Sequence, residues 1–419
     1  MLRHLVQSEF TGPVYPVNPS ADSVSSVPAF PSVRDLPTVP ELAVIVVPKE
    51  LVLGVVRECV QVGVQGLVVI TAGFREVGGE GVELERKLLA LVRENGLRMV
   101  GPNCMGVLNT SRDVSMNATF APALPSHGPI AFMSQSGAMG MTILDYAMEY
   151  GIGISQFVSM GNKADVSGND LIEYWQDDDE VGVILMYIEG FGNPRHFTTL
   201  ARRATRRKPV LAVKAGRSEA GAKAASSHTG ALAQVDIATD ALFAQCGVLR
   251  AETVEALFDA AIAFSKAPLP QGPRVAILTN AGGPGIIIAD ACEGFGLKVT
   301  PLADETQSRL REHLPAEASV ANPVDMIASA TPEQVEQALG IIVQDPGIDA
   351  VIASYVPLGL EAPVIAAAIK RGAEGSGKPV LAVLMSKRGL PQGMAELQAS
   401  PIPAYRLSLI HISEPTRRA

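Results

Sequence analysis

The chain has 419 residues, of which 47% are hydrophobic, so it is long enough for two or three domains that each bury a core. Its net charge of −9 argues against nucleic acid or an anionic membrane surface as a partner. No apolar run is long enough to cross a bilayer, no signal peptide is visible, and the four scattered cysteines lack zinc-like spacing, so we expect a cytoplasmic protein with reduced thiols and no metal site.

Apolar runs alternate with helical periodicity in the first part of the chain. Strands are predicted at Leu42–Val47, Gly66–Ile70 and Arg98–Val100. Helices are predicted between them, at Glu50–Val62 and Val82–Asn95. Short buried strands separated by helices indicate a parallel sheet.

Two stretches rich in proline and small residues read as linkers. They are Ala121–Gly128 and Ala267–Pro273. They predict three domains, at residues 1–122, 126–268 and 272–406.

The second and third domains look like copies of one another, because four features recur in the same order. In each domain a strand that follows a Gly-Pro pair, Gly128–Pro129 in the second domain and Gly272–Pro273 in the third, leads into a small-residue turn. Three further segments of the second domain match segments of the third: Asn162–Val166 matches Asn322–Met326, Asp178–Tyr187 matches Asp345–Tyr355, and Lys208–Val213 matches Lys378–Val383. We therefore predict two related, doubly wound α/β domains.

Each copy has a strand that ends in a small-residue turn and opens a helix. Helix N-termini present free N–H groups and partial positive charge, which suit a phosphate. The candidate phosphate-binding residues are Ser134, Ser136, Gly137, Ala281, Gly282 and Gly283. For Ser134–Gly137 the alternative is ordinary helix capping, and for Ala281–Gly283 it is a tight strand-to-helix turn without a ligand. Neither segment is a Walker loop.

His228 lies among alanine, serine, threonine and glycine residues that are too small to bury it. A neutral imidazole is a competent nucleophile near neutral pH, and two anion-holding turns beside one histidine suggest that it is phosphorylated. Such an imidazole needs a partner on its second ring nitrogen, and Glu189, after the apolar strand Val183–Ile188, is the best candidate. The alternative for His228 is an ordinary surface or core histidine, and the alternative for Glu189 is a solvated residue at the end of a strand.

Seven motifs together give the chain a family resemblance. They are Val14–Pro19, Val47–Pro48, Thr71–Phe74, Gly101–Gly106, Ser134–Ala138, Ser227–Ala231 and Asn280–Gly285. Over residues 10–400 the chain resembles the NDP-forming acyl-CoA synthetases, which include ADP-forming acetate–CoA ligases and are relatives of succinyl-CoA ligase.

The resemblance implies a Rossmann-like CoA-binding domain followed by two flavodoxin-like domains with doubly wound parallel sheets. It implies that acyl-CoA, phosphate and ADP are interconverted with a small carboxylic acid, CoA and ATP, with His228 and Glu189 as the catalytic pair. ATP or ADP and Mg²⁺ would bind an ATP-grasp module outside this chain, and a homo- or hetero-oligomer is implied. The CoA-binding residues that it implies are Asn18, Pro19, Val47, Pro48, Thr71, Ala72, Gly73, Pro102 and Asn103.

The two ends depart from the family pattern. The chain starts in the helix around Leu2–Phe10, without the first strand and glycine-rich turn that hold CoA phosphates in the family. Residues 407–419 look like translated sequencing-adaptor DNA. We therefore expect a fragment that is truncated at both ends.

Two other functions compete with the ligase. One is a non-catalytic region that senses acyl-CoA or CoA in a protein lysine acetyltransferase, fused to a GNAT domain. The other is a nicotinamide dehydrogenase, which is weaker because no complete G-x-G-x-x-G follows a first strand with an acidic residue at the proper distance.

Overall fold

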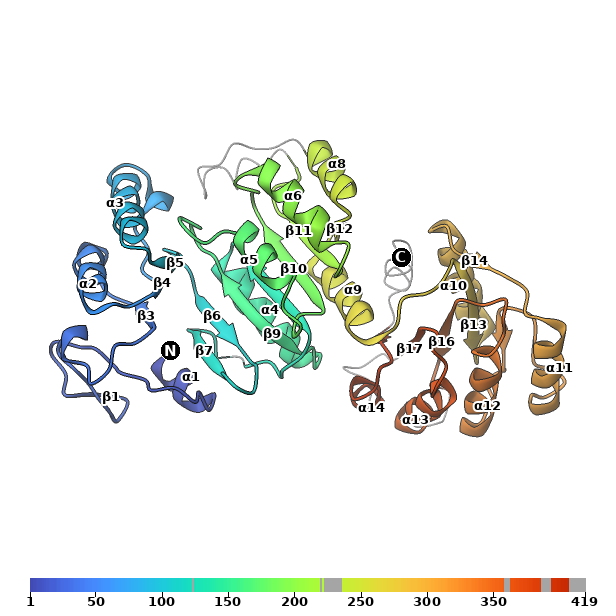
Figure 1. The fold of residues 1–419 in the computed structure, drawn as a ribbon. Helices are drawn as coiled ribbons and strands as arrows, with labels where there is room; N and C mark the ends of the chain where they lie inside the picture. Colours follow the sequence, from blue (N-terminus) through green and yellow to red (C-terminus); the bar gives the residue numbers. More distant parts are fainter. Residues whose placement is uncertain (123, 219–220, 222–235, 358–361, 386–392, 407–419) are drawn as a thin grey trace. The chain divides into compact units, whose positions relative to one another are not determined.

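The structure is a computed structural model of residues 1–419, shown in Figure 1. It describes the chain except for residues 123, 219–220, 222–235, 358–361, 386–392 and 407–419. The chain forms two compact units, Met1–Leu257 and Phe258–Ala419, and each is described by itself.

The first unit begins with a small parallel sheet in the order β3-β4-β5. Its strands are β3 (Leu42–Ile45), β4 (Gly66–Val69) and β5 (Arg98–Val100), and its helices are α2 (Lys49–Val62) and α3 (Glu80–Glu94). The two helices lie beside one another next to the sheet (Figure 1). All five elements agree with the sequence predictions to within two residues, because each has a clear apolar run or face.

Short elements surround this sheet. They are α1 (Leu2–Gln7), β1 (Ser23–Val24), β2 (Val27–Pro28) and the 3₁₀ turns η1 (Val33–Asp35) and η2 (Arg75–Val77). Strands β1 and β2 form an antiparallel pair.

The rest of the first unit is built on a seven-stranded sheet in the order β12-β11-β10-β8-β9-β6-β7. Its strands are β6 (Gly106–Asn109), β7 (Met116–Thr119), β8 (Ile130–Ser134), β9 (Ile154–Ser159), β10 (Val183–Ile188), β11 (Val210–Lys214) and β12 (Leu249–Arg250). The helices of this part are α4 (Gly137–Glu149), α5 (Gly168–Trp175), α6 (Pro194–Ala204), α8 (Asp236–Cys246) and α9 (Val254–Lys266), which crosses into the second unit.

The hairpin of β6 and β7 was not predicted from the sequence. Both strands lie within the predicted first domain, residues 1–122, yet β6 pairs antiparallel with β9 as well as with β7. Helix α1 in turn contacts β7. The expected boundary at residue 122 therefore does not separate the two sheets.

The second unit has its own sheet in the order β14-β13-β16-β17-β18, with β15 also paired to β13. Its strands are β13 (Arg274–Thr279), β14 (Lys298–Val299), β15 (Val324–Asp325), β16 (Ala350–Tyr355), β17 (Val380–Leu384) and β18 (Ala404–Arg406). Its helices are α10 (Gly282–Gly294), α11 (Asp304–His313), α12 (Pro332–Ile342), α13 (Ala362–Ala373) and α14 (Met394–Gln398).

The two larger sheets share one topology. The central strands β9-β8-β10-β11-β12 and β14-β13-β16-β17-β18 are all parallel and follow the flavodoxin order 2-1-3-4-5. The fold class predicted from the sequence is confirmed, including the two related doubly wound domains.

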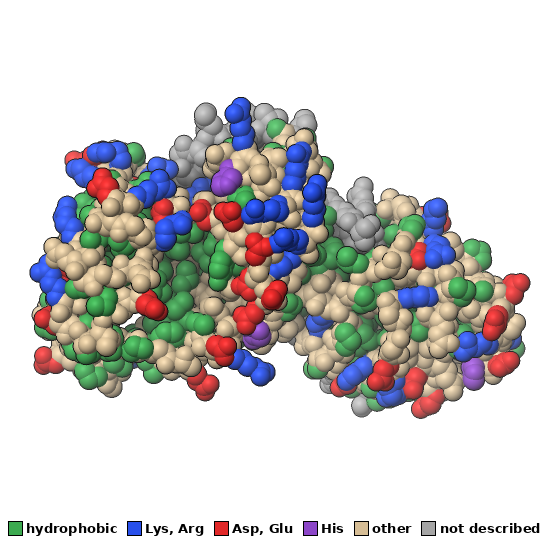
Figure 2. Space-filling model, viewed as in Figure 1, with side chains coloured by type: hydrophobic (Ala, Val, Ile, Leu, Met, Phe, Trp, Pro, Cys, Tyr) green, Lys and Arg blue, Asp and Glu red, His purple; other side chains and the backbone are tan. Residues whose placement is uncertain are grey.

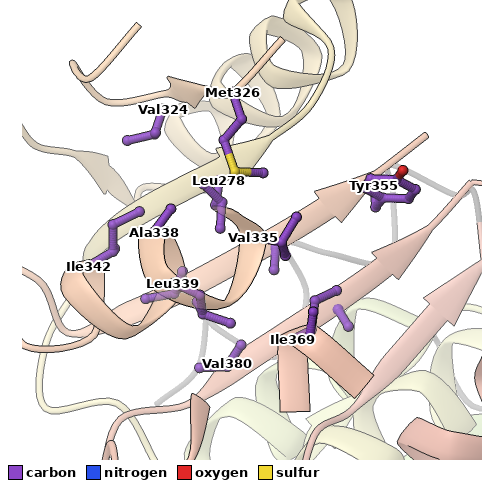
Figure 3. Close-up of a cluster of buried hydrophobic side chains, with 14 of the residues drawn as sticks. Leu278, Val324, Met326, Val335, Ala338, Leu339, Ile342, Tyr355, Ile369 and Val380 are labelled. Atoms are coloured by element: carbon purple, nitrogen blue, oxygen red, sulfur yellow. The ribbon is translucent and has the colours of Figure 1, made fainter. Parts of the chain in front are cut away.

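Side chains on the strands of the second unit alternate between two apolar layers. Leu278 and Ala276 face a core with α11, α12, α13 and α14, whereas Val275 and Ile277 face α10. Figure 3 shows the first layer, where Leu339 and Ile342 of α12 pack with Val380 of β17 and Ile369 of α13. Because both faces are covered, the strands are uniformly apolar and only their ends carry polar groups.

Charged side chains of both signs are intermixed on the face of the molecule drawn in Figure 2. One ion pair joins α6 to α5, between Arg203 and Glu173 at 3.3 Å. Another, between Arg207 and Asp177, joins the segments that follow these two helices. Within the described part of the chain, no helix is long and apolar enough to span a bilayer.

Candidate functional site

The candidate residues of the first unit meet where parallel strands of the larger sheet end. Ser134 is the last residue of β8 and pairs with Tyr187, just before the end of β10. Ile188, the last residue of β10, pairs with Lys214, the last residue of β11. Carboxyl ends of parallel strands at a point where strand order reverses form the usual binding crevice of open α/β sheets.

The turn after β8 is held by its own hydroxyl groups. Ser134 Oγ donates to the Ser136 carbonyl oxygen at 2.6 Å, and Ser136 Oγ accepts from Met139 N at 3.3 Å as the cap of α4. The capping alternative is therefore present in the structure. The N–H groups in the first turn of α4, which begins at Gly137, still point out of the helix end, where they suit an anion.

Gln135 links this turn to Glu189. Its Oε1 accepts from Glu189 N at 2.7 Å and from Gly190 N at 3.0 Å, and its Nε2 donates to the Gly190 carbonyl oxygen at 2.7 Å. The sequence had not singled out Gln135. Its amide therefore fixes the backbone of Glu189 and Gly190 next to the turn that precedes α4.

The second unit repeats this arrangement with neutral groups. Thr279 Oγ1 donates to the Ala281 carbonyl oxygen at 3.1 Å, and the Asn280 side chain exchanges two hydrogen bonds of 2.8 Å with the backbone of Val356. Strand register places Val356 where the first unit has Glu189, and Leu384 where it has Lys214. The fold therefore does not need a charge at these strand ends.

The helix end of the second unit is open but has an acidic neighbour. A side chain at Gly283 would meet no atom within 4 Å, and Ala281 offers no side-chain cap to α10. A Cβ at Gly282 would lie 3.1 Å from the carboxylate of Asp325. Because a carboxylate repels an anion, Asp325 disfavours phosphate binding at the start of α10.

Three of the predicted CoA-binding segments come together in the smaller sheet. Thr71 Oγ1 donates to the Val47 carbonyl oxygen at 2.7 Å, and Asn103 N donates to the Thr71 carbonyl oxygen at 3.0 Å. The segments of Pro48, Ala72–Gly73 and Pro102 adjoin these contacts in the chain. The role of all these residues stays a prediction.

Asn18 and Pro19 lie on a separate turn. Asn18 N donates to the Phe30 carbonyl oxygen at 2.8 Å, and its side chain accepts from Ser20 N. Among the described residues, no hydrogen bond joins this turn to Thr71 or Asn103.

A part-buried polar network beside the predicted CoA-binding segments was missed by sequence reasoning. Glu76 accepts from Gly73 N at 2.5 Å and from Phe74 N at 3.2 Å. Asn162 donates its amide to Glu76 at 2.6 Å and to Glu85 at 2.8 Å. Burial raises the pKa of Glu76, but the hydrogen bonds from Asn162 and the backbone outweigh it and leave the pKa below its usual value.

One signal in the sequence could have revealed this network. The side chain of Glu85 is 2% exposed and pairs with Arg75 at 3.0 Å. It lies one turn before Leu88 and two before Val92, on the buried face of α3. An acidic residue at an apolar position predicts a buried partner, although it does not identify Asn162.

Gly161, in the loop that carries Asn162, packs closely against the backbone that follows β5 of the three-stranded sheet. It has a φ of +54°, and a Cβ there would lie 2.3 Å from the carbonyl oxygens of both Pro102 and Asn103. We expect Gly161→Ala to lower the free energy of unfolding by at least about 2 kcal/mol, measured by chemical denaturation.

Gly54→Ala is the matched control, since a Cβ there would meet no atom within 4 Å in α2. It should stabilise the protein by up to about 1 kcal/mol. Equal denaturation midpoints for Gly161→Ala and wild type would contradict this expectation. They would show that the loop of Gly161 and Asn162 can move away from the first sheet without loss of stability.

Comparisons with known proteins agree with this architecture. A CoA binding domain model matches residues 1–110, a succinyl-CoA ligase like flavodoxin domain model matches residues 127–264, and a Ligase-CoA domain model matches residues 275–411.

Two curated relatives illustrate the sequence similarity. The chain is 44% identical over 399 residues to the acetate–CoA ligase [ADP-forming] II subunit alpha of Pyrococcus furiosus, covering 94% of this chain and 86% of the relative. It is 45% identical over 348 residues to the acetate–CoA ligase [ADP-forming] I of Archaeoglobus fulgidus, covering 83% of this chain and 50% of the relative. The chain thus spans most of an alpha subunit but about half of this longer relative.

A solved structure is similar over the full length. The dinucleotide forming acetyl-coenzyme A synthetase 1 of Ca. Korarchaeum cryptofilum, in complex with phosphate and ADP, superposes with a TM-score of 0.93 at 36% identity, covering 100% of this chain and 90% of that one. Three domain models match the chain in the same order, and the identities to the relatives are high. The chain therefore belongs to the family of the ADP-forming acetate–CoA ligases and corresponds to their alpha subunit.

Proposed function

We propose that the chain is the CoA-binding and phosphohistidine part of an ADP-forming acyl-CoA synthetase. With an ATP-grasp module it would interconvert acyl-CoA, phosphate and ADP with a carboxylic acid, CoA and ATP. The observation that carries the proposal is the position of Glu189, whose backbone Gln135 holds next to the turn that precedes α4. The residue at the equivalent position of the second unit is Val356.

The reaction would have three steps that balance. A phosphate oxygen attacks the thioester carbonyl carbon, the C–S bond breaks, and CoA leaves as the thiolate. A ring nitrogen of His228 then attacks the phosphorus of the acyl phosphate, the P–O bond to the acyl group breaks, and the carboxylate leaves. Finally a β-phosphate oxygen of ADP attacks the phosphohistidine, the P–N bond breaks, and ATP forms.

Each proposed group meets one demand of these steps. The N–H groups that open α4 stabilise the negative charge of the transferring phosphoryl group. Glu189 accepts the N–H of the second ring nitrogen of His228, which fixes the tautomer and stabilises the ring as it becomes cationic. His228 lies outside the described residues, so its place rests on the sequence.

The CoA-binding role falls to the segments that the Val47, Thr71 and Asn103 contacts hold together. Backbone N–H groups at strand ends of a Rossmann-like sheet are suited to the phosphates of such a ligand. The family-model match to a CoA binding domain over residues 1–110 supports this role.

The nucleotide half of the reaction would belong to an ATP-grasp partner, as a separate subunit or a further region. The alpha subunit named in one relative and the greater length of another support this division. Mg²⁺ would enter with the nucleotide and neutralise its phosphates. No group of three or more His, Cys, Asp or Glu side chains that could hold a metal lies among the residues the structure describes.

The alternative of a non-catalytic sensing region in a lysine acetyltransferase is not favoured. The relatives described above are named as ligases. Glu189 and Lys214 in the first unit, at positions where the second unit has Val356 and Leu384, also support turnover more than sensing.

The test is a half-reaction with the chain and its ATP-grasp partner. Acetyl-CoA and ³²P-labelled phosphate, without ADP, should release CoA thiol and put an acid-labile, base-stable label on this chain. Addition of ADP should remove the label as ATP. Acetyl-CoA binding without thiol release or label would overturn the proposal and restore the sensing alternative.

A further inference from the structure

One side chain from the larger sheet reaches two segments of the first sheet that are predicted to bind CoA. The segments are Thr71–Gly73, after β4, and Pro102–Asn103, after β5. The side chain is that of Asn162, in the loop between β9 and α5. Its Oδ1 accepts from Asn103 Nδ2 at 3.3 Å, and its Nδ2 donates to Glu76 Oε2 at 2.6 Å. The amide therefore contacts the second segment directly and the first one through Glu76.

The carboxylate of Glu76 holds the backbone of the first segment. It accepts from Gly73 N at 2.5 Å and from Phe74 N at 3.2 Å. Phe74 is fully buried, whereas Ala72, on the other side of Gly73, is exposed. Glu76 thus anchors a turn whose neighbouring residue stays accessible to a ligand.

The Asn162 amide is matched to two carboxylates. Its Nδ2 also donates to Glu85 at 2.8 Å, and Glu85 in turn pairs with Arg75 at 3.0 Å. Burial raises the pKa of Glu76, but the hydrogen bond from Asn162, followed by those from the backbone, brings it below its usual value, so this carboxylate is charged at pH 7. Replacing the amide by a carboxylate would remove both donors and add a third negative charge to the group.

The loop that carries Asn162 is fixed to both sheets of the first unit. On the side of the first sheet, Asn162 N donates to the Pro102 carbonyl oxygen at 2.9 Å. On the side of the larger sheet, the Nζ of the next residue, Lys163, donates to the Gly190 carbonyl oxygen at 2.7 Å, in the turn after β10. The Asn162 side chain is therefore held in place on a supported backbone, as a residue that positions a binding site must be.

The matching asparagine of the second unit is used differently. Asn322 stands in the sequence position of Asn162. Its Oδ1 accepts from Ile277 N at 2.9 Å, and its Nδ2 donates to the carbonyl oxygens of Val275 at 2.7 Å and Thr300 at 2.8 Å. These partners lie on β13 and just after β14, so Asn322 joins neighbouring strands of its own sheet. The reach of Asn162 into another sheet is thus particular to the unit that contains the predicted CoA-binding segments.

We propose that Asn162 is a positioning residue for CoA, whose amide joins the Thr71–Gly73 and Pro102–Asn103 segments into one binding surface. This inference rests on the proposed function, in which the two segments bind CoA. It adds a residue of the larger sheet to a site that the sequence confined to residues 18–103. Asn162 acts through Glu76 and Asn103 rather than by contact with the ligand.

The experiment measures CoA binding by Asn162→Asp and by the double variant Asn162→Asp with Glu76→Gln, in the full chain with its ATP-grasp partner. Asn162→Asp keeps the shape of the side chain but removes the donors to Glu76 and Glu85. In the double variant donor and acceptor are exchanged. The new glutamine amide can donate to the new carboxylate, while its oxygen still accepts from Gly73 N.

Asn95→Asp is the matched control. Asn95 is an exposed residue at the C-terminal end of α3, and its Nδ2 donates to the Leu91 carbonyl oxygen at 2.8 Å. The substitution therefore also removes a donor and adds a negative charge, at a helix end where the dipole disfavours it. It tests whether loss of stability beside the first sheet is enough to weaken CoA binding. The readouts are the Kd for CoA by titration calorimetry at pH 7, KM and kcat for acetyl-CoA in label incorporation, and the denaturation midpoint.

Asn162→Asp should raise the Kd for CoA at least about tenfold and raise KM for acetyl-CoA, with little change in kcat. The double variant should recover part of the affinity, because the bond between positions 162 and 76 is restored in the opposite direction. Asn95→Asp should keep the wild-type Kd even where its denaturation midpoint falls. If Asn162→Asp does not fold, Asn162→Ala takes its place with the same expected rise in Kd, because it removes the same bonds without adding a charge.

Two results would overturn the inference while leaving the proposed function intact. One is a wild-type Kd for CoA in Asn162→Asp. The other is a raised Kd that the double variant does not lower and that Asn95→Asp shows equally at the same loss of stability. Failure of the wild type to bind CoA would instead contradict the CoA-binding role in the proposed function.

Discussion

Replacing His228 by alanine should abolish transfer of phosphate from acetyl-CoA and phosphate to the chain. In the proposed mechanism the imidazole nitrogen is the atom to which the phosphoryl group bonds, so no other side chain can substitute by electrostatics alone. Loss of a covalent nucleophile costs at least about 10⁴-fold. The measurement is the amount of acid-labile ³²P label on the chain, together with the rate of ATP formation when ADP and the partner are present.

The matched control is His196→Ala. His196 is an exposed histidine in the first turn of α6, in the same unit, and the sequence gives it no role. This variant should label as wild type does. Equal labelling of His228→Ala and wild type would remove His228 from the mechanism while leaving CoA release as a separate question.

Glu189→Gln should slow labelling of His228 by about 10²- to 10⁴-fold, with little change in the affinity for acetyl-CoA. A glutamine keeps the size of the side chain, and the Gln135 contacts are to the backbone of Glu189 and Gly190, so the turn should persist. The loss comes from the charge that fixes the imidazole tautomer and stabilises its cationic form. Single-turnover label incorporation separates this effect from binding.

Glu180→Gln is the control, since Glu180 is an exposed carboxylate just before β10, at the other end of the strand that Glu189 follows. It should leave the rate unchanged. If Glu189→Gln labels at the wild-type rate, the carboxylate is a solvated strand terminus and the orienting group must be sought elsewhere.

Much of the architecture could be predicted because local patterns are strong where the strands are buried. The run Val183–Ile188 is apolar throughout and matches β10 residue for residue. The helix starts at Gly137 and Gly282 follow small-residue turns that differ little from other strand-to-helix turns of this fold class. Repetition of these signals in order was enough to identify two related domains.

The parts that were missed depend on contacts between distant residues. Asn162 meets Glu76 and Glu85, which are 86 and 77 residues away in the chain, and nothing in its local sequence specifies either partner. Gln135 was passed over because the neighbouring serines were the more obvious ligands. The partial burial of Lys163 follows from a loop folded against the first sheet, which periodicity cannot report.

The hairpin of β6 and β7 was not predicted, for a related reason. Its strands are four residues long, and in β6 buried and half-buried residues alternate, so the pattern is compatible with an independent hairpin. Only the antiparallel pairing of Val107 with Val158 and of Leu108 with Phe157 shows which sheet it joins.

That pairing means that the first two domains are not interchangeable modules. The strands that close one side of the larger sheet are supplied by chain that precedes residue 122, and α1 at the start of the chain rests on the outer one. A protein cut at residue 122 would leave β9 with a row of unsatisfied N–H and C=O groups, the kind of edge that recruits strands from other molecules. Recombination that exchanges the first sheet while retaining the larger one would therefore have to keep the hairpin with the larger sheet, with its junction before Gly106 rather than at the proline-rich connection.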